Sequence, residues 1–515
     1  MNQHTHSAHS SLLSQLLQEC NKQSANIAQL LTVPARNQQL IHHYLGLRFD
    51  ATRTNITSHG QKLLTQLAQE RTLPQAVKAL FNGVLVNQSE QRPALHMALR
   101  ADDPAALLAS DEARAVQAAR DTMLDWAGDF NAGHLPGRTE RRITDIIHIG
   151  IGGSDLGSRM LAKALPDRGC KPRLHFISAP DPYLWQHIVQ QAQADTTAVI
   201  ITTKSFGTPE TLALAEVARD WIGDHYRDRF FAVTAAPQAA SPLVPTEHIL
   251  PMWDWIGGRF SVWSCAGIMG AIAIGPEAFR QLLAGAAAMD QHFLQQDVGE
   301  NLPILMALYD YWHHSVQNYP VRGVFVYDQR LQLVPDWLRQ LEMESLGKKI
   351  QQDGTPVGQA TAPMLVGGSG PDAQHSIFQA LHQGTRPWPA EMITVAAHDA
   401  PQEKLQRLQW ASMLAQAQAL THGVAYPDHP ERQLPGQRPV LTWALDDLQA
   451  STLGSWLAAY EHKVYALACL WGINAFDQWG VEEGKRLTRL LMHSTEQQED
   501  TFDASTKAWL DVLKW

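Results

Sequence analysis

The sequence predicts an α/β fold made of two αβα sandwiches with parallel-rich sheets, with N-terminal helices packed on the body. From Thr144 onward, short apolar runs typical of buried strands alternate with longer segments in which apolar residues recur at helical spacing. This order is typical of βαβ units and parallel sheets. The same alternation begins again after a helix predicted over residues 301–318. Two successive blocks of this kind favour two sheets of similar architecture.

The segment before the first block is predicted to be helical. Between Ser11 and Ala101 leucines recur at the spacing of a helix face, and residues 102–104 are expected to form a linker. Arg92 and Arg100 lie in this segment, and we expect them either to pair with acidic groups in the body of the protein or to face solvent. These boundaries divide the chain into a helical segment (1–104), a first sandwich (105–288) and a second sandwich with C-terminal helices (289–515).

The strands of both blocks are predicted from short apolar runs that are rich in β-branched residues. Those of the first block cover residues 146–151, 174–178, 198–203 and 230–234. Those of the second block cover residues 323–327, 362–366, 392–396 and 440–444. Helices are predicted over residues 111–129, 208–222, 336–349, 374–383, 403–420 and 451–471. The segment 235–251, rich in proline and alanine, is expected to be a long loop.

The composition favours a soluble cytoplasmic protein. The chain has 515 residues, 45% of them hydrophobic, and its formal net charge of −10 argues against nonspecific binding to nucleic acid. Its four cysteines are scattered without CxxC spacing, which predicts neither a disulfide framework nor a zinc site. The N-terminus lacks the pattern of a secretory signal, and the most apolar run, residues 265–275, is too short to span a membrane. We therefore expect no membrane partner.

A glycine cluster ends the first predicted strand. The stretch Thr144–Gly157 runs from a series of isoleucines into glycines that include Gly152 and Gly153, and a helix is expected to begin at Ser154 or Asp155. Glycines let the backbone approach a ligand, and the first turn of a helix presents free N–H groups, so the stretch predicts an anion site. A dinucleotide-binding fingerprint would require glycine where Asp155 stands, and there is no Walker A motif. Phosphate without a nucleotide fits better.

A second strand-end loop, Thr202–Thr211, concentrates hydroxyl groups next to Lys204. Thr203, Ser205 and Thr208 can donate hydrogen bonds to phosphate oxygens, as can backbone N–H groups. An ordinary helix cap would need only Thr208 and a partner three residues later. The excess of hydroxyl groups favours phosphate binding over simple capping.

Four charged side chains further along the chain are candidates for chemistry, although each residue type is common in structural settings. Arg259 follows two glycines, a setting that suits stabilisation of a developing oxyanion. Glu344 lies near the end of a predicted helix, where most carboxylates are solvated. His375 lies at a helix start after the segment 367–374, where a single histidine is more often structural. Lys485 lies in a glycine-flanked motif at another predicted helix start.

Taken in order, these motifs resemble those of the phosphoglucose isomerase family. Each motif is short, but their shared order is highly specific. The resemblance implies two sugar-isomerase (SIS) domains in a homodimer that interconverts glucose 6-phosphate and fructose 6-phosphate, in glycolysis and gluconeogenesis. The matching segments extend from Asn87 to Lys485 and are NQSEQRPALHMALR, GIGGSDLG, TKSFGTPET, GGRFS, ESLGK, AQHSIFQALHQGT and QWGVEEGK.

The resemblance also implies a role for each candidate side chain. Proton transfer between C2 and C1 through a cis-enediol(ate) needs a base near neutral pH, and Glu344 matches the family's base. His375, contributed by the partner subunit, matches the histidine that opens the sugar ring, and Lys485 matches the lysine near the ring oxygen. Arg259 matches the arginine that stabilises the enediolate. Glu210 matches the acid that orients the histidine.

The remaining matches concern substrate binding. Gln340 lies one helical turn before Glu344, so both are expected to face the pocket. No metal or organic cofactor is implied, because neither a hydride nor an electron leaves the substrate. The positions that match the family's phosphate loops are Gly153, Ser154, Thr203, Lys204, Ser205 and Thr208.

The sequence departs from the family's motifs in three places. Leu346 stands where the base motif usually has asparagine, and Gly207 removes one hydroxyl from the phosphate loop. The segment 367–374 lacks the family's Glu-Pro-Gly and the glycine before Gln-His. Thr203 and Ser205 keep hydroxyl chemistry, so we expect phosphate binding to survive. The altered segment 367–374 is expected to affect substrate preference more than catalysis.

Two other functions remain open at this point. A non-catalytic sugar-phosphate sensor would need the phosphate loop but not the base, so the joint presence of Glu344, His375, Arg259 and Lys485 argues against it. An isomerase with an additional substrate, such as mannose 6-phosphate, is compatible with every motif.

Overall fold

The computed structural model of the protein describes residues 12–21, 26–167, 169–492 and 502–514. The chain divides into two compact units, residues 1–476 and 477–515, and each is described by itself. The N-terminal residues on which the expected absence of a secretory signal rested lie outside the described ranges. None of the described helices is long and apolar enough to cross a membrane. The domain boundaries expected at residues 104 and 288 stay predictions.

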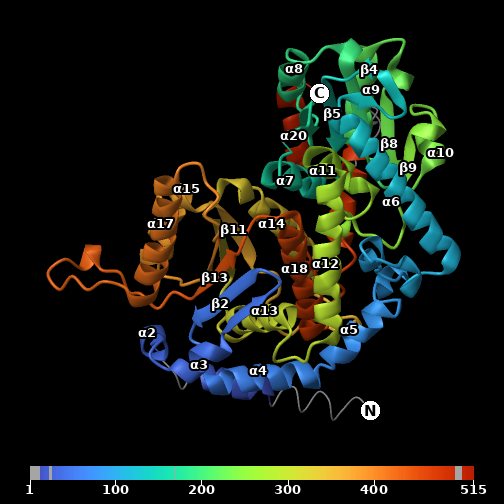
Figure 1. Ribbon diagram of the computed structural model, residues 1–515. Helices are drawn as coiled ribbons and strands as arrows, with labels where there is room; N and C mark the ends of the chain where they lie inside the picture. The colour runs from blue at the N-terminus through green and yellow to red at the C-terminus, as the bar shows by residue number, and fades with distance from the viewer. Residues whose placement is uncertain (1–11, 22–25, 168, 493–501, 515) are drawn as a thin grey trace. The chain divides into compact units, whose positions relative to one another are not determined.

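The first large sheet is fully parallel, as predicted, with its five strands in the order β6-β5-β7-β8-β9 (Figure 1). Its strands are β5 (Asp145–Gly150), β6 (Arg173–Ile177), β7 (Thr197–Thr202), β8 (Phe230–Thr234) and β9 (Ile249–Pro251). Its helices are α6 (Ser110–Asn131), α7 (Leu156–Ala164), α8 (Pro182–Val189), α9 (Pro209–Ile222), α10 (Pro237–Ala240) and α11 (Ile268–Ile274). A small hairpin, β3 (His134–Leu135) with β4 (Arg138–Arg142), precedes it.

Both faces of this sheet are covered. Successive side chains of a strand point to opposite sides, and those on each side pack in a core. Ile147 and Val199 pack with residues of α9, such as Leu214, in one core. Ile146 and Ile200 belong to the large core on the other face. The prediction that 235–251 is a loop is wrong for β9 and α10. Each is too short to leave a periodic pattern in the sequence.

The second large sheet has six strands in the order β1-β2-β13-β12-β10-β11. β10 (Val321–Val326), β11 (Met364–Ser369), β12 (Ala390–Val395) and β13 (Val440–Leu445) are mutually parallel. The helices of this half are α12 (Pro276–Gln295), α13 (Leu302–Tyr311), α14 (Val334–Leu346), α15 (Gly370–Gln374), α16 (Ile377–Gln383), α17 (Glu403–His422) and α18 (Ala450–Trp471). Phe325 and Met392 face one core while Val324 and Ile393 face the other, so the predicted two-sandwich α/β class is confirmed.

The prediction that residues 11–101 are entirely helical is wrong for a hairpin formed by β1 (Ile41–Tyr44) and β2 (Leu47–Arg53). β2 pairs antiparallel with β13 and thereby extends the second sheet. Leu47, Phe49 and Ala51 alternate as buried residues, a period-two pattern that neighbouring leucine-rich helices obscure. The helical parts of this segment are residues 12–21, α2 (Ile27–Leu30), α3 (Pro34–Gln39), α4 (Ser58–Glu70) and α5 (Leu73–Phe81).

Helices α12 and α18 lie side by side at very short range (Figure 1). A Cβ atom on Gly285 of α12 would lie 1.9 Å from the carbonyl oxygen of Ser451, so only glycine fits there. The Ser455 hydroxyl of α18 donates to the Gly285 carbonyl at 2.9 Å. This contact joins the helix that follows the first sheet to the helix that follows the second.

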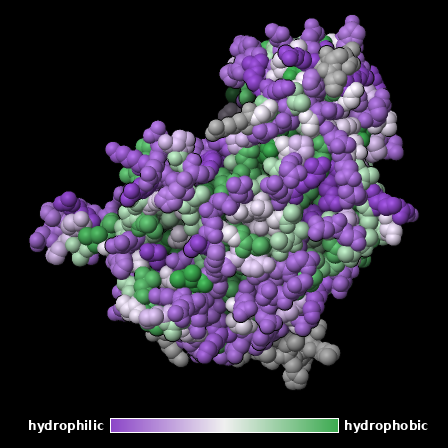
Figure 2. Space-filling view, in the orientation of Figure 1, coloured by the Kyte–Doolittle hydropathy of each residue, from purple (hydrophilic) through white to green (hydrophobic). Residues whose placement is uncertain are grey.

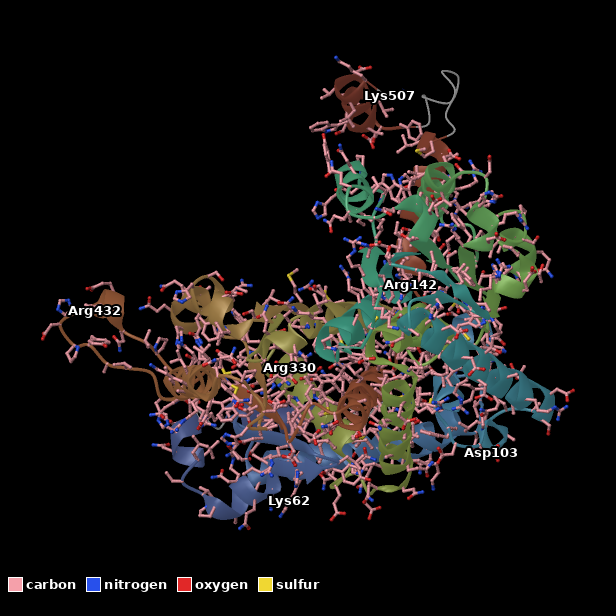
Figure 3. The ribbon with its side chains drawn as sticks, turned by 45° about the horizontal axis from the view of Figure 1, so that its top comes forward. Lys62, Asp103, Arg142, Arg330, Arg432 and Lys507 are labelled. Carbon is pink, nitrogen blue, oxygen red and sulfur yellow. The ribbon has the colours of Figure 1, made fainter. Side chains whose placement is uncertain are left out.

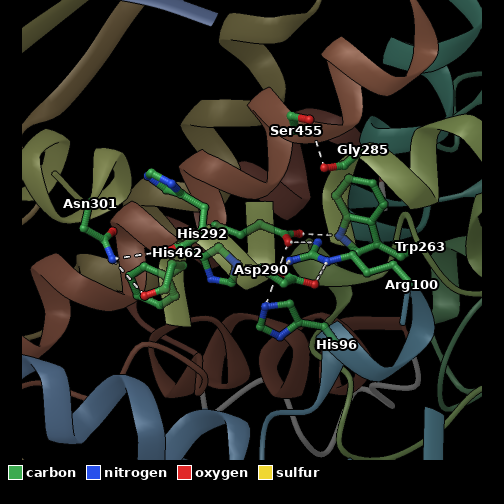
Figure 4. A network of polar contacts seen from close by, with 11 residues as sticks. His96, Arg100, Trp263, Gly285, Asp290, His292, Asn301, Ser455 and His462 are labelled. Carbon is green, nitrogen blue, oxygen red and sulfur yellow. Dashed lines mark hydrogen bonds and ion pairs between the residues drawn. The ribbon is translucent and has the colours of Figure 1, made fainter. Parts of the chain in front are cut away.

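Arg100 confirms the expected pairing with acidic groups in the body. It lies fully buried beside α12 and α18 (Figure 4). Its Nε donates to Asp290 at 2.8 Å and its Nη1 to Glu461 at 2.5 Å, and Trp263 donates to the other Glu461 oxygen at 2.8 Å. Burial disfavours the charged form and raises the pKa of the Glu461 carboxyl to about 7, and the nearby Asp290 carboxylate adds to this rise. Arg92, by contrast, forms an exposed ion pair with Asp254 at 3.5 Å.

A second buried charge cluster centres on Arg322 of β10. Its guanidinium pairs with Asp310 of α13 at 3.0 Å, Glu342 of α14 at 2.6 Å and Glu391 of β12 at 3.1 Å. Lys463 of α18 reaches Asp310 at 2.5 Å and Glu342 at 3.0 Å. The cluster therefore ties three helices to two strands of the second sheet. Each buried charge has opposite charges at hydrogen-bond distance, as burial requires.

Between α17 and β13 the chain forms a long projecting loop, in which Figure 3 labels Arg432. The Arg432 guanidinium lies 5.3 Å from the centre of the Tyr426 ring. On the face in Figure 2, which is mostly hydrophilic, apolar side chains gather near α17 and the start of this loop. Exposed apolar residues of this part are Leu405, Leu408, Leu414, Val424 and Tyr426.

The second unit contains two described helices, α19 (Glu482–Met492) and α20 (Ala504–Leu513). A short 3₁₀ turn, Trp479–Val481, leads into α19. The Asp503 carboxylate caps the start of α20 by accepting from the N–H of Thr506 at 2.9 Å.

We predict that His313 makes the fold sensitive to acid. His313 lies in a π-helical turn (Trp312–Val316), fully buried, and burial lowers its pKa to about 3. The unfolded chain takes up a proton near pH 6.5, so the stability that the neutral ring contributes is present above that pH and is lost as the pH falls toward 3. In urea unfolding, His313→Phe should gain about 2 kcal/mol relative to the wild type between pH 7.5 and pH 5. The exposed His225→Gln should show no such drift, and an equal drift in both variants would contradict the assignment.

Candidate functional site

The glycine loop follows β5 at the carboxyl edge of the first sheet, where ligands of parallel sheets bind. Residues Gly152–Ser154 form a 3₁₀ turn, and α7 begins at Leu156, close to the predicted start. Asp155 occupies the N-cap position, but among the described contacts its side chain makes no capping hydrogen bond to the helix backbone. Its carboxylate is buried and pairs instead with Arg159 at 2.9 Å.

Gly153 brings this loop into direct contact with the segment that carries Arg259. A Cβ atom on Gly153 would lie 2.2 Å from the carbonyl carbon of Gly258 and 2.6 Å from the backbone nitrogen of Arg259. The Ser261 hydroxyl lies 3.3 Å from the Gly153 carbonyl oxygen and 2.7 Å from that of Gly258. The two predicted motifs therefore form one surface, and only a glycine allows their backbones to come so close.

Helix α14 brings two further predicted residues to the same place. Gln340 Nε2 lies 3.0 Å from the position that a Cβ atom would occupy on Gly152. One turn later, Glu344 Oε1 lies 3.2 Å from Nη1 of Arg259. The Arg259 side chain is 1% exposed, whereas that of Glu344 is 24% exposed and accessible to a small molecule. A carboxylate, a guanidinium, an amide and a glycine loop thus converge.

Two of the groups that hold Arg259 are neutral acceptors that the sequence did not indicate. Its Nε donates to the Ser345 hydroxyl oxygen at 2.6 Å, and its Nη2 donates to the carbonyl oxygen of Ala475 at 2.6 Å. Ser345 is adjacent to Glu344 within the ESLGK motif, and this position was the only sequence feature that could have pointed to it. Ala475 lies beyond α18, more than two hundred residues along the chain, and a backbone carbonyl carries no sequence signal at all.

The hydroxyl loop leaves the neighbouring strand at the same level as the glycine loop, since Thr202 pairs with Gly150. Thr208 stands at the N-cap of α9, but its side chain makes no capping hydrogen bond among the described contacts. The capping alternative therefore has no support, and the hydroxyl remains available for a ligand. Ser205 is exposed, while Thr203 is buried and its N–H donates to the Val233 carbonyl at 3.0 Å.

The side chain of Phe206 anchors this loop to the core. Its ring is buried in the core beside α9, and its backbone has φ of 46°, a conformation uncommon for a residue with a side chain. Lys204 points elsewhere: its Nζ donates to the carbonyl oxygens of Asp254 at 2.9 Å and Ile256 at 3.1 Å. Burial lowers the pKa of the Lys204 ammonium group. Its assignment to phosphate stays a prediction.

His375 and Glu210 lie in this unit without a described contact to each other or to Glu344. His375 directly follows α15, and its exposed side chain has no hydrogen-bond partner among the described residues. Glu210 lies in the first turn of α9 and is partly exposed. Gln374, the residue before His375, is anchored because its amide donates to the Tyr327 hydroxyl at 3.0 Å.

Lys485 belongs to the second unit. It lies in the first half of α19, and its ammonium group pairs with Glu482 at 2.7 Å. Its predicted role therefore stays a prediction. Among the residues that the structure describes, no group of three or more His, Cys, Asp or Glu side chains is arranged to hold a metal ion.

Comparisons with known proteins identify the same family of similar proteins over nearly the whole chain. The family model for phosphoglucose isomerase matches residues 50–510. A glucose-6-phosphate isomerase of Stenotrophomonas maltophilia (strain R551-3) is 42% identical over 495 residues, which cover 95% of this chain and 96% of that protein. One from Xanthomonas euvesicatoria pv. vesicatoria (strain 85-10) is 40% identical over 491 residues, 95% of each chain. Among solved structures, a glucose-6-phosphate isomerase from Chlamydia trachomatis D/UW-3/Cx is similar with a TM-score of 0.86, 28% identity and 98% coverage of both chains.

We predict that Gly153→Ala separates the two loops of this site. The added methyl group would meet the backbone of Gly258 at 2.2 Å, and backbone atoms cannot swing aside as a side chain can. The free energy of unfolding should fall by about 3 kcal/mol or more. Gly207→Ala is the matched control, because a Cβ atom there has no neighbour closer than 3.7 Å. Equal unfolding midpoints for the two variants in urea would show that the close contact is absent.

Proposed function

Because the chain belongs to the phosphoglucose isomerase family, we propose that it interconverts glucose 6-phosphate and fructose 6-phosphate by ring opening and proton transfer through a cis-enediol(ate). The observation that carries this proposal is the convergence of Glu344, Arg259 and Gln340 on the glycine loop. A carboxylate that is partly exposed and lies 3.2 Å from a buried guanidinium can take a proton from carbon while the guanidinium faces the oxygen that becomes negative.

The phosphate group is proposed to bind at the hydroxyl loop. Ser205 and Thr208 present hydroxyl groups at the start of α9, where helix N–H groups and the helix dipole favour an anion. Thr203, Lys204 and the turn at Gly153 and Ser154 complete the proposed binding surface. Phosphate there would direct the sugar carbons away from the strand ends, toward the adjacent glycine loop.

The proton transfer follows from these positions. In the direction from aldose to ketose, the Glu344 carboxylate removes the proton from C2, and the electrons of that bond form the C1–C2 double bond of the enediolate. The negative charge develops on O1, where Arg259 stabilises it. Glu344 then returns its proton to C1, and the O2 proton is transferred to O1, so that C2 becomes the carbonyl carbon and C1 carries the hydroxyl group. The substrate gains and loses no electrons overall.

Ring opening is proposed to need a second copy of the chain. The side chain of His375 is exposed and has no hydrogen-bond partner among the described residues, as expected for a side chain that completes a partner's site. Its tautomer would be set there by Glu210, and Lys485 would lie near the ring oxygen. Exposed leucines support a partner: Leu405 and Leu408 of α17 are 62% and 63% exposed and border a hollow of about 830 Å³ that Pro371 also lines. A cytoplasmic homodimer is the proposed state.

The departures from the family's motifs leave the proposed chemistry intact. Leu346, which replaces the usual asparagine, is fully buried in the large core. Its side chain therefore serves packing rather than the pocket. Gly207 is exposed at the loop that also carries Ser205 and Thr208, so the lost hydroxyl leaves two hydroxyl groups in place.

The direct test is turnover in deuterated water. The protein is incubated with fructose 6-phosphate in D₂O, and glucose 6-phosphate and its C2 deuterium are followed by NMR. Formation of glucose 6-phosphate that carries deuterium at C2 is expected, because the base exchanges its proton with solvent. The absence of turnover at micromolar protein would refute the isomerase proposal and favour a sensor.

We predict that Glu344→Gln lowers kcat by about 10²–10⁴-fold, the usual contribution of a general base. The amide keeps the size of the carboxylate but cannot accept the proton, so the Kd for sugar phosphate should change little. Glu216→Gln, at an exposed position of α9, serves as the control. A Glu344→Gln variant that keeps the wild-type rate would exclude Glu344 as the base.

We predict that His375→Ala damages ring opening more than proton transfer. Isomerisation of cyclic glucose 6-phosphate should slow at least about 100-fold. Exchange of the C2 proton of an open-chain aldose phosphate, such as erythrose 4-phosphate, should slow much less, because that substrate has no ring to open. Both rates are measured by NMR in D₂O, with His225→Ala as the control. Equal losses on both substrates would contradict the role of His375.

A further inference from the structure

We propose that Ser345 is a positioning residue for the reaction: its hydroxyl oxygen fixes the orientation of the Arg259 guanidinium and so sets where the developing negative charge is stabilised. This inference rests on the proposed isomerase function. It assigns a role to a residue of the ESLGK motif that none of the sequence assignments includes.

The contact is short and fully enclosed. Arg259 Nε lies 2.6 Å from Ser345 Oγ, and the serine is 0% exposed while the arginine side chain is 1% exposed. A guanidinium so deeply buried needs acceptors for its N–H groups, because water cannot replace them. The hydroxyl is such an acceptor, and it lies where no solvent molecule would take its place if it were removed.

The three contacts of the Arg259 guanidinium explain why the Ser345 hydroxyl controls the direction in which this group faces. Ser345 accepts at Nε, the Ala475 carbonyl accepts at Nη2 and Glu344 lies at Nη1. A planar group held at Nε and Nη2 cannot rotate about its own axis, so Nη1 keeps facing Glu344. Glu344 and Ser345 are consecutive on α14. One turn of this helix therefore fixes the position of the base and, through Ser345, the orientation of Arg259, which stabilises the negative charge.

The two neutral acceptors also matter electrostatically. A hydroxyl and a carbonyl can fix a guanidinium without adding a negative charge beside it. When Glu344 takes the proton from C2 it becomes neutral, and the attraction between Glu344 and Arg259 weakens at the moment when the enediolate forms. An orientation held by Glu344 alone would be lost at that moment, whereas the hydrogen bond to Ser345 persists through the step.

Loss of the hydroxyl should therefore affect kcat more than substrate binding. Ser345→Ala should lower kcat about 10–100-fold, as expected when a residue that orients a catalytic group is removed. KM should stay within about threefold, because the hydroxyl loop that holds the phosphate is untouched. Ser345→Cys, whose thiol is somewhat larger and accepts hydrogen bonds poorly, should resemble the alanine variant.

Ser455→Ala is the matched structural control. Ser455 is also a buried helical serine, and its hydroxyl donates to the Gly285 carbonyl at 2.9 Å (Figure 4). Both alanine variants should lose stability to a similar extent, but only Ser345→Ala should lose kcat. If Ser455→Ala lowers kcat as much, the effect of Ser345 is general loss of packing and the proposal is wrong.

A double-mutant cycle tests whether Ser345 acts through Arg259. Lysine at position 259 lacks an Nε–H, so in Arg259→Lys protein the additional change Ser345→Ala should cost less than about threefold in kcat. The same cost in both backgrounds would overturn the proposal.

A second readout needs no activity. The Nε–H resonance of Arg259 in protein labelled with ¹⁵N-arginine, identified by its absence in Arg259→Lys, should exchange slowly with solvent in the wild type and become fast or shifted in Ser345→Ala. An unchanged resonance would refute the positioning role. Absence of turnover in the wild type would instead refute the proposed function, so the two failures are distinguishable.

Discussion

A single buried guanidinium, that of Arg322, holds together the half of the molecule that supplies the candidate base. It pairs with carboxylates from α13, α14 and β12 at 2.6–3.1 Å, and Lys463 of α18 shares two of them. Removing one partner from such a cluster leaves an uncompensated buried charge, which costs about 3–5 kcal/mol. Glu342 of α14 faces this cluster, and Glu344, two residues later, points to the other side of the helix toward Arg259. The ion pair between Arg322 and Glu342 thus also fixes how α14 is turned about its own axis.

The candidate site forms where segments from both sandwiches meet. The glycine loop and Arg259 follow strands of the first sheet, whereas Gln340 and Glu344 lie on a helix of the second. The contact of Gly285 of α12 with Ser451 of α18 supports this meeting, and the contact of Gly153 with Gly258 joins the two loops of the first sandwich. A site divided between two sandwiches depends on the precision of their packing, and glycine at these positions allows the closest approach.

Much of this architecture was predictable, because buried parallel strands are continuous apolar runs and their ends carry the ligand-binding loops. The glycine loop, the hydroxyl loop and the place of Glu344 one turn after Gln340 follow from that rule and from helix periodicity. The β1–β2 hairpin was not predictable, since its strands are short and lie among leucine-rich helices. The acceptors around Arg259 were hidden for another reason: Ser345 resembles any helical serine, and the Ala475 carbonyl belongs to the backbone. The partner residues proposed for ring opening depend on a second chain, which periodicity within one chain cannot reveal.

The most direct test of the account is a crystal structure of the protein with sorbitol 6-phosphate, an open-chain analogue that cannot isomerise. We expect its phosphate at the loop formed by Thr203, Ser205 and Thr208, and its C1 and C2 between Glu344 and Arg259. His375 of the partner subunit should lie at the hydroxyl that would close the ring. A phosphate bound elsewhere, or carbons C1 and C2 out of reach of Glu344, would contradict the central claim that these loops and α14 form one isomerase site.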